Sequence, residues 1–89
     1  SQNNVFNFPN PFENFTTIQY ELISDARVSL KVFDLTGREV FSLPESFKSA
    51  GIQNIIFDGS LLGSGIYFYN LSVKGTSNFT ENGSMIIKR

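Results

Sequence analysis

Strict alternation of apolar and polar side chains is the feature that most constrains the fold of this chain. Successive side chains of a β-strand point to opposite faces, so a period of two predicts strands that are buried on one side. No window of the sequence has the spacing of an amphipathic helix. The predicted inward positions are Ile18, Tyr20 and Leu22, then Val28, Leu30 and Val32, and finally Tyr67, Tyr69, Leu71 and Val73.

Turn-forming residues separate these segments about every 8–12 positions, which is typical of an all-β sandwich. Strands are predicted at residues 4–8, 16–22, 27–34, 38–43, 52–58, 65–73 and 78–88. The stretch from Pro44 to Gly51 is predicted to be a polar loop. The 89 residues leave room for one domain, residues 1–89. We therefore expect an immunoglobulin-like, seven-stranded antiparallel β-sandwich.

Two connections carry more specific signals. Residues 34–37 read as a hairpin turn, because Asp34 can bond the turn backbone and Gly37 can adopt a left-handed conformation. Residues 78–88 are predicted to form one bulged strand rather than a hairpin at Asn82-Gly83, because the apolar residues on either side share parity.

The prolines near the start predict an extended edge segment. Pro9 and Pro11 fix φ and lack backbone donors, so this stretch should resist further pairing. Phe12, which follows them, is expected to close one end of the sandwich.

The composition argues against catalysis. Histidine and cysteine are both absent, which removes His-based triads, thiol nucleophiles and typical zinc sites. The eight acidic residues are scattered over turns and outward strand positions, so neither a glycosidase pair nor a calcium loop is expected. Gly59, Gly63 and Gly65 follow a strand but precede no helix, so a phosphate site is not expected. We predict no enzyme, no cofactor and no small-molecule substrate.

Charge and aromatic content restrict the partners further. The net charge is −1 and no basic block is present, so a nucleic-acid partner is not expected. Most aromatic side chains have inward parity and should pack in the core. Phe33 and Phe68 are exceptions, because their parity is opposite to that of their apolar neighbours. In a two-sheet sandwich we expect one of these two side chains to be partly exposed and available to a partner.

An ordered set of segments resembles a known family. The segments are Phe8-Pro9-Asn10-Pro11-Phe12, residues 16–22, residues 28–34, Gly37-Arg38-Glu39-Val40, Gly51, Phe57-Asp58, Leu62, residues 65–69 and the ending Met85-Ile86-Ile87-Lys88-Arg89. Together they resemble the type A C-terminal sorting domains of proteins exported by the type IX secretion system of Gram-negative bacteria. The resemblance runs from about Val5 to Arg89. It departs at Ser84, where the family often has a lysine.

The resemblance implies that the domain directs a larger upstream cargo protein across the outer membrane. The implied partners are the outer-membrane secretion machinery, including a shuttle protein and a sortase-like protease that removes the domain. The cargo is then anchored at the cell surface or released. The family's most important residues for export correspond here to Met85 through Arg89.

A terminal strand with a flexible basic tip could be captured by strand addition or by a pocket. We expect Ile86, Lys88 and Arg89 to face the receptor, while Met85 and Ile87 pack inward. Deletion of Lys88 and Arg89 is then expected to block export with little change in melting temperature.

Two other interpretations remain open on the sequence. An immunoglobulin-like structural module of flagellar hook-capping proteins shares some of these segments, but it is expected to have tryptophan at the position of Phe57. An accessory module that binds carbohydrate or protein would need a solvent-exposed row of aromatic residues. The ending directly after a short apolar strand favours the sorting domain.

Overall fold

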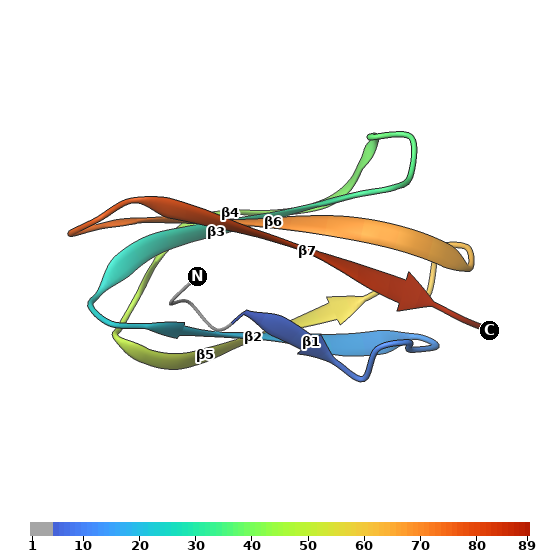
Figure 1. Cartoon of the computed structure of the whole chain (residues 1–89), viewed down its shortest axis with the longest axis horizontal. Helices are drawn as coiled ribbons and strands as arrows, with labels where there is room; N and C mark the ends of the chain where they lie inside the picture. The colour runs from blue at the N-terminus through green and yellow to red at the C-terminus, as the bar shows by residue number, and fades with distance from the viewer. Residues whose placement is uncertain (1–4) are drawn as a thin grey trace.

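The computed structural model describes residues 5–89 and contains seven strands in that range. Asn4, the first residue of the predicted first strand, lies outside the described residues. Two antiparallel sheets lie face to face (Figure 1). One sheet has the order β1-β2-β5, formed by Phe6–Phe8, Phe15–Leu22 and Gly51–Asp58. The other has the order β4-β3-β6-β7, formed by Glu39–Lys48, Ala26–Phe33, Gly65–Gly75 and Phe79–Ile87.

The fold class predicted from the alternation is confirmed. Two stacked antiparallel sheets of short strands make an immunoglobulin-like sandwich. In the constant-type immunoglobulin arrangement the fourth strand joins the sheet of the first, second and fifth. Here β4 instead pairs with β3, and the chain changes sheets between β4 and β5.

The core is formed by the residues that the period of two placed inward. Ile18, Leu30, Val32 and Leu71 are almost fully buried between the sheets. Tyr20, Tyr67 and Tyr69 are buried as well. Since alternate side chains of each strand face the same layer, burying one set leaves the other set on the outer faces. Sequence parity therefore fixes which side chains remain available to a partner.

The prediction of a loop at residues 44–51 is wrong for most of this segment, which belongs to a strand. β4 continues through Pro44 and ends at Lys48. β3 pairs with this strand through Leu30↔Leu43 and Val28↔Ser46, so Pro44 and Glu45 lie opposite the single residue Ser29 and one extra residue of β4 is accommodated at a bulge. Proline is compatible with a strand at a bulge or a sheet edge, and β4 occupies an edge. Only a short turn then leads to β5.

The turn at residues 34–37 forms as predicted. The Asp34 carboxylate accepts hydrogen bonds from the backbone N–H groups of Thr36 at 2.9 Å and Arg38 at 3.0 Å. The Thr36 hydroxyl donates a third, and these bonds lower the pKa of Asp34. Gly37 has a φ of 89°, in the left-handed region that glycine tolerates.

β7 is one continuous strand, as predicted, but it has no bulge. It pairs with β6 from Phe79↔Val73 to Ile87↔Gly65 without a change of register. Gly83 allows this, because a Cβ at that position would come within 2.3 Å of the Tyr69 ring. The missing side chain is therefore required by cross-strand packing of an aromatic ring, and not by a turn.

The prediction of an extended edge segment at Pro9–Pro11 is also wrong. β1 ends at Phe8, and the chain then bends through residues 9–11. The bend brings Phe12 beside Ile87 at one end of the sandwich, where Phe12 is buried against Phe57. The predicted role of Phe12 as an end plug is confirmed.

Candidate functional site

The C-terminal part of β7 presents alternate side chains to the core and to solvent. Met85 and Ile87 are 0% and 1% exposed, whereas Ile86 between them is 40% exposed. Met85 and Ile87 pack inward as expected, and the side chain of Ile86 is exposed to solvent. The two buried residues hold the strand in the sheet, so the position of the Ile86 side chain is fixed by the fold.

The free edge of β7 is already paired at this end. The Ile86 N–H donates to the Asn10 side-chain oxygen at 2.9 Å, and the Phe12 N–H donates to the Ile86 carbonyl at 2.9 Å. The Lys88 N–H donates to the Phe12 carbonyl at 2.9 Å. Because residues 10–12 use these backbone groups, an incoming strand cannot pair there without displacing them. A partner must therefore contact the side chains, rather than the backbone, at this end of β7.

Arg89 does not form the flexible tip that the sequence suggested. Its backbone N–H donates to the Ser64 hydroxyl at 3.2 Å, and its guanidinium donates to the Gly59 carbonyl at 2.6 Å. The guanidinium also donates to the Leu62 carbonyl and to the Asn14 side chain. Charged donors make stronger hydrogen bonds than neutral ones. Arg89 therefore fastens the end of the chain to the loop between β5 and β6.

An exposed apolar patch surrounds Ile86 on the outer face of the four-stranded sheet. Ile66 lies opposite Ile86, and Phe68 in the next outward row lies opposite Phe33 on β3. Ile66 and Phe68 are 44% and 42% exposed, and Phe33 is partly buried. We call Phe33, Ile66, Phe68 and Ile86 the outer patch. A shallow hollow of about 710 Å³ adjoins it, lined in part by Lys31, Asn70 and Asn82.

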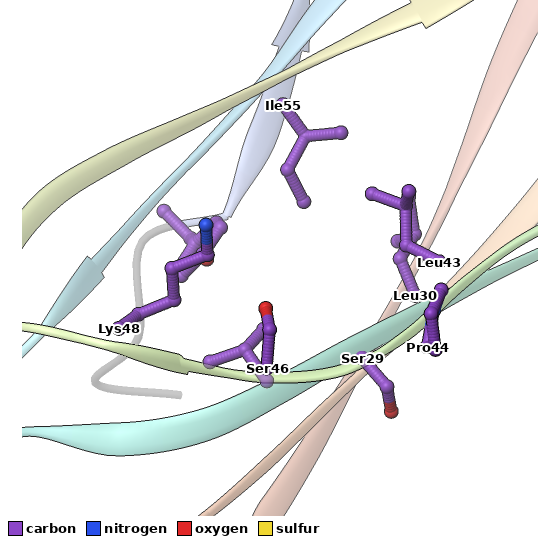
Figure 2. Close-up of a pocket in the computed structure, with 9 residues that line it drawn as sticks. Ser29, Leu30, Leu43, Pro44, Ser46, Lys48 and Ile55 are labelled. Atoms are coloured by element: carbon purple, nitrogen blue, oxygen red, sulfur yellow. The ribbon is translucent and has the colours of Figure 1, made fainter.

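A second pocket, of about 250 Å³, is lined by residues of β4 and β5, which are edge strands of different sheets, and by residues of β2 and β3. In Figure 2, Leu43 and Ile55 project toward the space between these strands, whereas Ser29 points away. Lys48 and Tyr20 are the titratable side chains in its lining. The other residues of the lining are apolar side chains and serines.

Within residues 5–89, no group of three or more His, Cys, Asp or Glu side chains could hold a metal ion. The same part of the chain contains no helix long and apolar enough to cross a membrane. The shifts in acidity also have structural causes. Hydrogen bonds from Ser60 lower the pKa of Asp58, and burial raises the pKa of Tyr20 and Tyr69.

Comparison with known families identifies the domain. The model of the secretion system C-terminal sorting domain matches residues 7–88, nearly the whole chain. The chain belongs to this family. The sorting domain is the C-terminal signal of type IX secretion, and such a signal works through recognition and is not itself catalytic. The family also implies a secreted or cell-surface protein that interacts with secretion machinery.

Solved structures support the same fold. The crystal structure of dimeric latent PorU from Porphyromonas gingivalis matches the sorting domain with a TM-score of 0.74 and 25% sequence identity. The match covers 96% of this chain and 9% of that chain. The sorting domain therefore spans a small part of the length of that protein. No curated protein sequence matches the chain.

Sequence reasoning found part of the outer patch and missed the rest. Parity predicted that one of Phe33 and Phe68 would be partly exposed; Phe68 is exposed, and Phe33 is partly buried. Ile66 was not singled out, although it shares the parity of Phe68 and the same rule could have found it. The contact of Asn10 with Ile86 joins positions 76 residues apart, and no local pattern signals it.

Proposed function

We propose that residues 1–89 form one sorting domain, the address of a larger cargo protein that lies before Ser1. In this proposal a receptor of the outer-membrane secretion machinery contacts Ile86, Lys88 and Arg89. Met85 and Ile87 act from inside the core by holding the last strand in place. A shuttle protein then passes the cargo on, and a sortase-like protease removes the domain.

The observation that supports this proposal is the alternation at the end of β7. An aliphatic side chain that is 40% exposed lies between two that are 0% and 1% exposed. Backbone edge groups of this segment are occupied by Asn10 and Phe12, which leaves the side chains for recognition. Removal of the domain and anchoring or release of the cargo rest on the family resemblance alone.

A reporter exported to the periplasm and fused to residues 1–89 tests the proposed contact residues. In type IX-competent cells, Ile86→Ser should reduce the surface fraction of the reporter by roughly ten-fold or more, the loss expected for a central contact residue. Ile52→Ser is the matched control, because Ile52 is 62% exposed on the opposite sheet. Equal surface fractions for Ile86→Ser and wild type would reject Ile86 as a contact residue.

A further inference from the structure

We infer that the receptor docks on the outer face of the four-stranded sheet, with Phe33, Ile66 and Phe68 joining Ile86 in one contact surface. The partner is a protein surface with apolar side chains flanked by carboxylates. This inference rests on the proposed function and extends its contact site from the last strand to two neighbouring strands.

The geometry makes the outer patch continuous. β6 places Ile66 directly opposite Ile86, and Phe68 lies two residues further along β6 on the same face. β3 places Phe33 directly opposite Phe68. Side chains opposite each other in a sheet lie close enough to touch, with Cβ atoms about 4.5–5.5 Å apart. A partner that reaches Ile86 therefore meets the aromatic side chains as well.

The occupied edge of β7 decides how the partner can bind. The backbone groups of Ile86 and Lys88 on the free edge are bonded to Asn10 and Phe12. Strand addition at this end would have to break those bonds. Docking on the face leaves them intact and removes apolar surface from water, which favours binding. The shallow hollow beside the patch gives space for a partner side chain.

Charge distinguishes this face from the other exposed apolar face. The described strands β1, β2 and β5 contain no lysine or arginine, and they carry Glu21 and Asp58. On the four-stranded sheet, the outward positions of β3 and β6 include Arg27, Lys31 and Lys74, and the exposed Lys88 follows β7. The ion pair of Lys31 with Glu39 is long, at 3.9 Å, and leaves Lys31 57% exposed. β4 adds the acidic Glu39 and Glu45 to this sheet, so basic side chains outnumber acidic ones on its outer face by a small margin. This excess of basic groups fits a partner that carries carboxylates around an apolar centre.

The opposite face carries Phe6, Phe8, Ile52 and Ile56, which are at least as exposed as the outer patch. Its charged side chains are acidic, and it does not adjoin β7. If exposure were the only criterion, that face would be the better candidate for the contact surface. The outer patch is the better candidate because it is continuous with Ile86 and has the more basic surroundings. The two faces can therefore be tested against each other in the same chain.

The test uses the reporter fusion with single substitutions on each face. Ile66→Ser and Phe68→Ser should each lower the surface fraction by roughly ten-fold, with reporter retained in the periplasm. Ile56→Ser, at a position 70% exposed on the opposite face, should leave export unchanged. Melting temperatures of the purified domains show whether each variant is folded.

Charge reversal tests the same surface without touching its apolar centre. Lys31→Glu should lower export, whereas Glu21→Lys on the opposite sheet should not. If the wild-type fusion is exported and Ile66→Ser, Phe68→Ser and Lys31→Glu are exported equally well, the outer patch is not the contact surface. Loss of export with Ile56→Ser alone would place the interface on the other sheet. A wild-type fusion that stays in the periplasm of competent cells would overturn the proposed function, and this surface with it.

Discussion

Gly83 lies opposite Tyr69, and the aromatic ring occupies the space that a Cβ would need. Gly83→Ala should lower the free energy of unfolding by about 1–3 kcal/mol, the usual cost of overpacking a core. Gly63→Ala is the control, because a Cβ at that exposed position meets nothing within 4 Å. Thermal unfolding of both variants measures the difference. Equal melting temperatures would show that the Tyr69 ring can move aside.

Two tyrosine hydroxyls of the core differ in hydrogen bonding. Within the described chain, the Tyr20 hydroxyl is buried without a hydrogen bond, whereas the Tyr67 hydroxyl donates to the Gly63 carbonyl at 2.8 Å. A buried polar group without a partner is destabilising, and a typical hydrogen bond contributes about 1 kcal/mol.

Tyr20→Phe should therefore raise the melting temperature and Tyr67→Phe should lower it. The expected change is about 4–8 °C for each kcal/mol in a domain of this size. The comparison controls for the tyrosine-to-phenylalanine change itself, since the two substitutions remove the same atom. A lower melting temperature for Tyr20→Phe would mean that this hydroxyl has a partner in solution.

At the scale of elements, the end of β7 is held from three directions. β6 pairs with it along one edge, residues 10–12 pair with it along the other, and Arg89 bonds to the loop that follows β5. The last two residues therefore have different roles. The side chain of Lys88 is exposed, whereas that of Arg89 donates to the carbonyls of Gly59 and Leu62.

Arg89→Ala should accordingly destabilise the domain by about 1 kcal/mol or more, since hydrogen bonds from charged groups are lost. Lys88→Ala, the matched control, should leave stability within about 0.5 kcal/mol, as is usual at surface positions. Chemical denaturation of the purified domains measures both. Because Arg89 is bonded to the loop after β5, we now expect deletion of Lys88 and Arg89 to lower the melting temperature rather than to leave it unchanged. Identical stability of the two variants would contradict the role given to Arg89.

The elements also show what the sequence can and cannot predict. Alternation identified the inward faces of β2, β3, β6 and β7, because side-chain direction in a strand depends only on position. It failed at Pro44, where a bulge on an edge strand tolerates a residue that usually ends strands. It also missed the contacts of Asn10 and Arg89. These join segments far apart in the chain, and only the tertiary fold brings them together.

At the scale of the whole molecule, the sandwich has two outer faces of different character. The three-stranded sheet carries exposed apolar side chains with acidic neighbours. The four-stranded sheet carries the outer patch, and basic side chains outnumber acidic ones on its outer face. The core fixes both faces, because outward side chains alternate with buried ones along β2, β3 and β6. The fold thereby presents the end of β7 as part of a rigid surface rather than as a loose peptide.

The most direct measurement of the central claim is the surface fraction of a periplasmically exported reporter fused to residues 1–89. It is compared between cells with an intact type IX system and matched cells without it. We expect the fusion on the surface of the competent cells and retained in the periplasm of the deficient ones, with the unfused reporter periplasmic in both. Equal surface fractions in the two cell types, or periplasmic retention in both, would contradict the assignment of this domain as a sorting signal.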